Sequence, residues 1–299
     1  LLLQALALGL SAFPLFLIAR KYLNLQTSLV VAFLYLIYPG TVYTNLFEAH
    51  VTPFATFFLM WSIYCFIISD FVWFLIFGTL AMLCQENIPL IFLSMGFMAM
   101  LMNRRGYWVW VPIVWGGVYF LFCILWVLPH FSEGKLDHFI LYRHLGSNYT
   151  ELVKNLILNP HMTWELMTSP SRIQYLVDVL SPLFFVPLLG IKGLLPIGLI
   201  FFQHMLSGRS YDRSMEFYYL AEMLPFIFYG YILGLSYLKK YLMVFRFVIF
   251  LSILMVTLAF LRGPAMRIYG EFQSKYLDYN KNYAVLKSEA LSRIPADVP

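Results

Sequence analysis

Charged side chains are scarce in this chain of 299 residues, where Asp, Glu, Lys and Arg together make up 12%. A soluble domain carries about 25%. Hydrophobic residues reach 61%, and the mean hydropathy is +0.76. This composition excludes an ordinary soluble domain and indicates a polytopic membrane protein surrounded by membrane lipids. The net charge of +5 is small and scattered along the chain, so nothing in it favours a nucleic-acid partner.

Cysteine is also scarce, and no internal repeat or low-complexity segment stands out. Cys65, Cys84 and Cys123 all lie in or beside apolar runs. This placement speaks against a disulfide framework and against a cysteine-based zinc site.

What the chain does contain is a series of apolar runs. A spanning helix needs about 20 residues, so about ten spans fit. We predict an all-α transmembrane helical bundle over residues 1–261, including a long extracytoplasmic loop at 129–172 whose short helices lie on the membrane interface. Residues 262–299 are polar and are expected to begin a C-terminal extracytoplasmic segment. The predicted spans are 1–19, 28–44, 54–68, 71–83, 88–102, 108–128, 173–189, 194–206, 217–238 and 242–261.

The chain opens at Leu1 inside an apolar run, without an initiator Met. We therefore expect a fragment of a longer protein, with an N-terminal span and a first loop that precede Leu1.

Basic residues in the short loops set the expected orientation. Under strict alternation, Arg20-Lys21, Arg104-Arg105, Lys192 and Lys239-Lys240 fall on one side. Because cytoplasmic loops carry an excess of Lys and Arg, this side is predicted to be the cytoplasm. The other polar clusters then face outward.

Two of these outward clusters are candidates for a functional site. Glu48 and His50 lie between two apolar runs, and an ionisable group beside hydrocarbon marks a functional site by default, although a solvated turn is the simpler interpretation. Gln85-Glu86-Asn87 follows the run 71–83, which as a helix covers only about 20 Å of roughly 30 Å of hydrocarbon. We therefore expect Glu48 and Glu86 to share one recessed pocket, with Arg209 or Arg213 at its rim.

Several short motifs follow one another along the chain in a distinctive order. They are Leu3-Gln4-Ala5, Tyr38-Pro39, Phe47…His50…Pro53, Gln85-Glu86-Asn87, Tyr142-Arg143-His144-Leu145-Gly146, Asn159-Pro160, Ser181-Pro182-Leu183, Tyr218-Tyr219…Pro225 and Ile294-Pro295-Ala296-Asp297. Over essentially its whole length the chain thereby resembles a family of bacterial and archaeal membrane proteins, domain of unknown function 2079 (DUF2079). That family in turn resembles the GT-C superfamily of polytopic glycosyltransferases.

The resemblance implies a function at the cytoplasmic (inner) membrane of a prokaryote. The protein would transfer a sugar from a polyprenyl-phosphate donor to an acceptor at the extracytoplasmic face. Two departures matter: Gln85-Glu86-Asn87 stands where the family tends to show Lys-Glu-Asp, and the acidic residue that GT-C enzymes usually carry in the first outer loop would precede Leu1.

Such a reaction needs a base to take the proton of the acceptor hydroxyl, and cations or a divalent metal ion to hold the departing phosphate. The candidates for the base or for metal ligands are Glu48, His50 and Glu86. The candidates for binding phosphate and substrate are Arg143, His144, Arg209, Arg213 and Tyr218.

Each candidate also has a simpler interpretation. Glu86 can cap the helix that follows it, Arg209 and Arg213 can anchor the protein to anionic lipid, and Tyr218 can belong to an interfacial aromatic belt.

Two other functions are compatible with the sequence. A transporter or flippase for lipid-linked intermediates also needs polar groups at depth, but with paired sites reachable from both faces. A member of the family that binds such lipids without catalysis is the third alternative. The crowding of acidic and basic residues on the predicted outer side favours chemistry at that surface.

The topology yields a first prediction. Single cysteines at positions 104 and 138 are treated with a membrane-impermeant thiol reagent in intact cells, with the unsubstituted chain as the background control. We expect labelling at 138, and at 104 only after permeabilisation, because the positive-inside pattern places Arg104 in the cytoplasm. Labelling at 104 but not at 138 in intact cells would overturn the topology.

Overall fold

The computed structural model describes residues 1–131, 138–272, 285 and 287–288. This part of the chain is helical and contains no strand, so the predicted all-α class is confirmed. The first part forms α1 (Leu2–Leu10), α2 (Ala12–Tyr22), α3 (Leu25–Ile37), α4 (Pro39–Leu46), α5 (Thr52–Ile68), α6 (Phe71–Met82), α7 (Ile88–Leu101) and α8 (Tyr107–Phe122).

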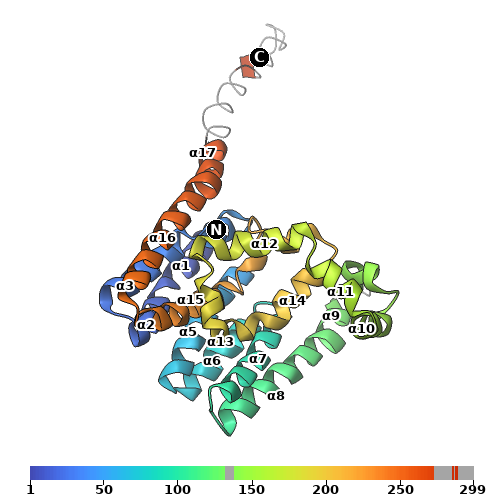
Figure 1. The fold of residues 1–299 in the computed structure, drawn as a ribbon. Coiled ribbons are helices and arrows are strands. Elements are labelled where there is room, and N and C mark those ends of the chain that lie inside the picture. The colour runs from blue at the N-terminus through green and yellow to red at the C-terminus, as the bar shows by residue number, and fades with distance from the viewer. Residues whose placement is uncertain (132–137, 273–284, 286, 289–299) are drawn as a thin grey trace, which may run out of the picture.

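A π-helical turn at Cys123–Val127 leads from α8 into α9 (Leu128–Phe131). The long loop then carries a 3-10 helix at His138–Leu145 and the helices α10 (Tyr149–Leu158), α11 (Pro160–Met167) and α12 (Pro170–Leu180). These helices are short, as predicted, and α12 lies across one end of the bundle (Figure 1).

The remaining helices are α13 (Ile191–Leu194), α14 (Gly198–Leu206), α15 (Leu224–Leu238), α16 (Leu242–Phe260) and α17 (Met266–Phe272). Short 3-10 turns connect them at Ser181–Leu183, Val186–Gly190, Leu195–Ile197, Ser210–Arg213 and Tyr218–Leu220, and a π-helical turn at Leu261–Ala265 joins α16 to α17. The motif at residues 294–297 lies outside the described residues.

Four helical segments of the described chain are long and apolar enough to cross a membrane: Leu2–Tyr22, Tyr107–Phe131, Val186–Leu206 and Leu242–Glu271. The pair α3 and α4, bent by 40°, would make a fifth. The helices α5, α6, α7 and α15 are apolar but shorter. About ten spans are therefore not confirmed and stay a prediction.

Four segments differ from the predicted spans. The span predicted over 194–206 begins already at Val186, so Lys192, which was predicted in a cytoplasmic loop, lies inside the candidate span Val186–Leu206. Where one span was predicted over 173–189, α12 ends at Leu180 and the chain reverses through Phe184 and Phe185, both with positive φ. Pro182 and Pro187 lie in this reversal, and proline cannot continue a helix. The helix predicted to end at residue 261 runs on to Phe272, and the span predicted from 217 becomes an α-helix only at Leu224.

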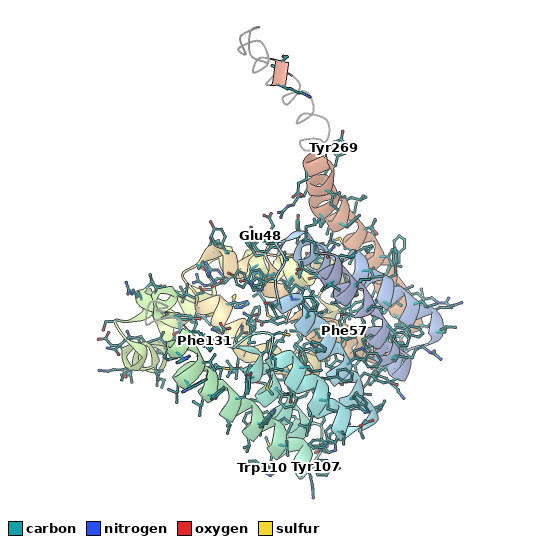
Figure 2. All side chains as sticks on the ribbon, turned by 180° about the vertical axis from the view of Figure 1, so that it is seen from behind. Glu48, Phe57, Tyr107, Trp110, Phe131 and Tyr269 are labelled. Atoms are coloured by element: carbon teal, nitrogen blue, oxygen red, sulfur yellow. The ribbon has the colours of Figure 1, made fainter. Side chains whose placement is uncertain are left out.

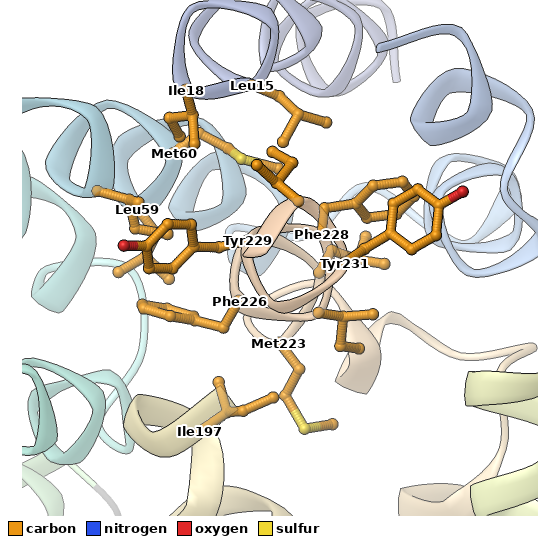
Figure 3. Close-up of a cluster of buried hydrophobic side chains, with 14 of the residues drawn as sticks. Leu15, Ile18, Leu59, Met60, Ile197, Met223, Phe226, Phe228, Tyr229 and Tyr231 are labelled. Carbon is orange, nitrogen blue, oxygen red and sulfur yellow. The ribbon is translucent and has the colours of Figure 1, made fainter. Parts of the chain in front are cut away.

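The centre of the bundle is α15, in which every residue from Leu224 to Leu235 is buried. Figure 3 shows its aromatic side chains pointing to opposite sides, with Phe226 and Tyr229 on the side of Leu59 of α5 and Phe228 and Tyr231 on the other side. Leu15 and Ile18 of α2 and Met60 of α5 lie on a third side, and Ile197 lies near Met223. A helix that is apolar on all faces is stable only when neighbours surround it. The other elements are thus arranged around α15.

Glycines let α15 contact the preceding segment backbone to backbone. A Cβ on Gly190 would collide with the carbonyl oxygen of Gly230, and a Cβ on Gly193 would lie 2.7 Å from the Gly230 nitrogen. Likewise, a Cβ on Gly234 would collide with the carbonyl oxygen of Val186. This close approach holds the segment Val186–Leu194 directly against α15.

We predict that Gly190→Ala destabilises the protein by about 1–3 kcal/mol, because the new methyl group meets backbone that cannot move aside. The measurement is the thermal melting temperature of the purified protein in detergent. The matched control is Gly198→Ala, where a Cβ would meet nothing within 4 Å and alanine favours the helix. Equal melting temperatures for Gly190→Ala and the unsubstituted protein would contradict the close packing.

Candidate functional site

Three connecting segments meet at one end of the bundle: residues 47–51 between α4 and α5, residues 83–87 between α6 and α7, and residues 207–223 between α14 and α15. Thr52 bonds to Gln85, His50 stacks on Tyr218, and Asn87 bonds to Glu222. Figure 2 shows Glu48 far from Tyr107 and Trp110, which lie at the other end. The two polar clusters that the sequence placed on one side therefore do lie together.

A glutamine in α1 holds the turn that carries His50. Gln4 is 2% exposed; its Nε2 donates to the carbonyl oxygen of Thr44 at 2.9 Å, and its Oε1 accepts from the backbone N–H of His50 at 3.0 Å. Burial leaves this amide no water to bond, so it must pair with the backbone. Gln4 thereby fixes where the chain leaves α4.

The ring of His50 is oriented by a chain of two hydrogen bonds. Its Nδ1 lies 3.0 Å from Thr52 Oγ1, and that hydroxyl donates to Gln85 Oε1 at 2.8 Å. A hydroxyl has one proton to give, so Nδ1–H of the neutral ring donates to Thr52 and Nε2 keeps its lone pair. The Thr52 backbone N–H is 3.5 Å from Nδ1, too far to reverse this assignment.

The face of the His50 ring lies on Tyr218, with ring centroids 3.8 Å apart and an angle of 21° between the planes. Burial lowers the pKa of His50, and the nearby Glu86 opposes this shift. The imidazole is therefore neutral at pH 7. Tyr218 also contacts Tyr219, whose ring faces the Arg209 guanidinium at 5.0 Å.

A second titratable group lies behind this stack. Glu222 is 1% exposed, accepts from Asn87 Nδ2 at 2.9 Å, and has His204 Nε2 3.9 Å from its Oε1. Glu222 precedes the first residue of α15. Burial raises the pKa of its carboxyl to about 8; the bond from Asn87 opposes the shift and the charge of Glu86 adds to it.

Arginines organise the loop between α14 and α15. Arg209 donates to Asp212 Oδ1 at 2.8 and 2.6 Å, and the Ser207 hydroxyl donates to Asp212 Oδ2 at 2.6 Å. Arg213 and Arg172 both donate to the carbonyl oxygen of Ser207. In the described part of the chain neither Arg172 nor Arg213 forms an ion pair, so two guanidinium groups at this loop lack a carboxylate partner.

Two cavities adjoin the loop. The first has a volume of about 250 Å³ and is apolar, lined by Tyr175, Leu176, Val179, Leu180, Leu188, Ile191, Leu194, Leu195, Ile197, Gly198, Phe201, Leu220, Met223 and Ile227. The second, of about 310 Å³, is polar and lined by Pro39, Tyr43, Asp178, Ser181, Pro182, Arg213, Ser214, Met215, Glu216 and Ala259. Tyr175 lies at the apolar cavity within electrostatic reach of Glu222, Asp212 and Arg213.

The two predicted acids, Glu48 and Glu86, differ in their exposure to solvent. Glu48 is exposed, whereas Glu86 is half-buried and acts electrostatically on His50, Tyr218 and Glu222. Glu48 thus lies on the surface and not in the recess expected for it. Within the described residues no three His, Cys, Asp or Glu side chains are grouped to hold a metal ion, so Glu48, His50 and Glu86 do not form such a group.

The predicted residues of the long loop lie in the 3-10 helix His138–Leu145, where Arg143 and His144 are exposed. This helix packs on the arginine loop, since the Gly208 N–H donates to the carbonyl oxygen of Leu141 at 2.8 Å. Burial of part of the ring, then the charges of Arg172 and Arg213, lower the pKa of His144. His144 therefore lies beside the loop between α14 and α15, which carries Arg209 and Arg213.

Several residues of the site were not among the predicted site residues, although the sequence suggests that Glu222 faces the outer cavity and not lipid. The structure adds Gln4, Thr52, Arg172, His204 and Glu222. Gln4 stands in one of the short motifs, and a polar residue between apolar positions is a signal for burial with a partner. Which partner each would take required the fold.

A comparison with family models matches residues 1–298 of the chain to the family described as "Predicted membrane protein (DUF2079)". The comparison with curated proteins and the one with solved structures found no match. The resemblance to that family is thus confirmed, whereas the resemblance to GT-C glycosyltransferases stays a prediction. The apolar helices, the polar site at one end of them and the match over nearly the full length lead to one conclusion: the chain belongs to the DUF2079 family of predicted membrane proteins.

Proposed function

We propose that this protein transfers a sugar from a polyprenyl-phosphate donor to an acceptor at the outer face of a prokaryotic cytoplasmic membrane. The short apolar helices would complete the spans of the predicted GT-C-like bundle. One observation carries the proposal: an apolar cavity adjoins a loop at which the guanidinium groups of Arg172 and Arg213 have no ion-pair partner among the described residues. A polyprenyl-phosphate donor combines the same two features, a long apolar chain and an anionic group.

The apolar cavity suits the isoprenoid end of the donor. It is bounded by α12, by the segment Val186–Leu206 and by the start of α15, and its lining includes Leu180, Ile197 and Met223. Ligand pockets are mostly apolar, with a few polar groups that fix orientation. Here Tyr175 is the lining side chain with a polar group.

The guanidinium groups of Arg172 and Arg213 suit the phosphate. Arg213 lines the polar cavity together with the acidic residues Asp178 and Glu216, and its Nε is buried with no hydrogen-bond partner in the described chain. Arg172 is 6% exposed, and its guanidinium donates to the carbonyl oxygens of Met205 and Ser207 and to the Ser169 hydroxyl, with no carboxylate among these partners. Hydrogen bonds from arginine to phosphate are stronger than those between neutral groups. Arg209, in contrast, already has its carboxylate partner in Asp212.

His50 is the base in this proposal. Its ring is neutral and its Nε2 lone pair is free of partners among the described residues, so it can accept the proton of an acceptor hydroxyl. The acceptor oxygen then bonds to the sugar carbon while the bond from that carbon to the phosphate oxygen breaks. The polyprenyl phosphate leaves with the added negative charge, beside the arginines. Glu86 stabilises the imidazolium that results.

The rival functions predict other behaviour. A flippase would move the labelled lipid across the membrane without forming a glycosylated product. A binder would retain the lipid and do neither. Both outcomes can be read in the same reconstituted vesicles.

The first activity prediction concerns the base. In the full chain reconstituted with radiolabelled lipid donor, His50→Ala should lower kcat at least about 100-fold, and Glu86→Gln should lower it too. Because burial lowers the pKa of His50, activity should be lost with falling pH only below the ordinary histidine value of about 6.5. The control is His161→Ala on α11, whose side chain is 84% exposed. Unchanged turnover in both His50→Ala and Glu86→Gln would exclude the transferase and leave transport or binding.

The second activity prediction concerns the phosphate. Arg213→Ala should raise the KM for the lipid donor about tenfold or more, because a charge-assisted hydrogen bond contributes about 1.5–3 kcal/mol. The expected effect on kcat is smaller, since a phosphate contact acts in the ground state as well. Arg213→Lys should restore part of the affinity, and the exposed Arg246 of α16 supplies the control Arg246→Ala. An unaltered KM in Arg213→Ala with intact folding would remove the arginine loop from the donor site.

A further inference from the structure

A carboxyl group lies just before α15, the helix at the centre of the bundle in which every residue from Leu224 to Leu235 is buried. Ala221, Met223 and Leu224 are buried on either side of Glu222, which is itself 1% exposed. Taking an ionised carboxylate out of water is costly unless a cation and several donors compensate for it. The surroundings of Glu222 decide whether such compensation exists.

The contacts of Glu222 are few. Oε1 accepts one hydrogen bond, from Asn87 Nδ2 at 2.9 Å. His204 Nε2 is 3.9 Å from that same oxygen, which is beyond hydrogen-bond range. Oε2 is buried without a partner in the described chain, and so are His204 Nδ1 and Asn87 Oδ1. A carboxylate would therefore be left under-compensated here.

The charges that face this group do not favour its ionised form. The turn before α7 brings Glu86, whose negative charge opposes ionisation of Glu222. From α12 comes the buried hydroxyl of Tyr175, and from α14 comes His204. Asp212, Arg209 and Arg213 act on His204 from the loop, but no arginine or lysine of the described residues forms an ion pair with Glu222.

We propose that Glu222, Asn87 and His204 form a buried proton-binding site, in which the Glu222 carboxyl holds the proton. The Asn87 amide presents N–H towards Oε1, which the carbonyl oxygen of a carboxylic acid can accept and which repels a metal cation. A protonated carboxyl keeps one acceptor oxygen for Asn87 and places its proton on Oε2. The site is separate from the sugar transfer proposed above and requires no lipid donor.

Loss of the proton would place a negative charge in the segment that lines the apolar cavity and also carries Tyr218, which stacks on His50. Leu220 and Met223 line the apolar cavity, and Tyr218 of the same segment stacks on His50. The two protonation states of Glu222 therefore present different electrostatic surroundings to both places.

The test is infrared spectroscopy of the purified full-length chain across a pH series, reading the C=O stretching band of a protonated carboxylic acid. We expect a band that persists at neutral pH and disappears with a midpoint near pH 8, that is missing in Glu222→Gln, and that is retained in Glu216→Gln, whose carboxyl is exposed. Asn87→Ala, which removes the donor to Oε1, should move the midpoint higher. A band that titrates near the ordinary value of 4.5, or that is lost when sodium ions are added at neutral pH, would overturn the proposal.

A second measurement, the melting temperature as a function of pH, tests the same site without relying on the infrared spectrum of Glu222→Gln. With its pKa raised in the folded state, Glu222 contributes stability that is full below about pH 4.5 and is lost as the pH rises through about 8. The melting temperature of the unsubstituted protein should thus fall with rising pH relative to that of Glu222→Gln, and Glu216→Gln should parallel the unsubstituted protein. Parallel curves for Glu222→Gln and the unsubstituted protein would contradict the site.

Discussion

The backbone contact between α15 and the segment Val186–Leu194 is the constraint on which the rest of the structure depends. Gly190, Gly193, Gly230 and Gly234 leave no room for side chains at this contact. In a bilayer the hydrophobic effect cannot drive helices together, so close packing of small residues has to hold them. With α15 fixed in this way, α2 and α5 pack around it (Figure 3).

The segment between α14 and α15 builds the candidate site together with the turns that precede α5 and α7. The chain leaves α14 at Leu206 and enters α15 at Leu224, so the intervening segment must close over one end of the bundle. Arg172 and Arg213 hold it by bonding the carbonyl oxygen of Ser207, and Arg209 pairs with Asp212. The result is that two guanidinium groups, those of Arg172 and Arg213, lie near the apolar cavity without a carboxylate partner among the described residues.

Ionisable groups at this end of the bundle avoid unpaired negative charge. Burial lowers the pKa of His50 and raises that of Glu222, so both side chains are neutral at pH 7. Glu86 is half-buried and lies within electrostatic reach of both. A charged side chain beside hydrocarbon has a high free-energy cost. Here His50 and Glu222 reduce this cost by being neutral, and not by forming ion pairs with arginine or lysine. That arrangement suits the proton transfer proposed for His50 and the proton site proposed at Glu222.

The sequence by itself determined the membrane class, the all-helical fold and the family, because composition, the length of apolar runs and the order of short motifs are properties of the chain alone. It also placed the turn of His50 and the turn of Glu86 on one side, since helices that alternate bring every second loop together. Only the tertiary structure decided that α12 does not continue into the next span, and that Gln4, Thr52 and Gln85 orient His50. It likewise decided that Glu222, more than 130 residues from Asn87, becomes its partner. Such pairings depend on how buried polar groups find each other across the bundle, and no local pattern encodes that.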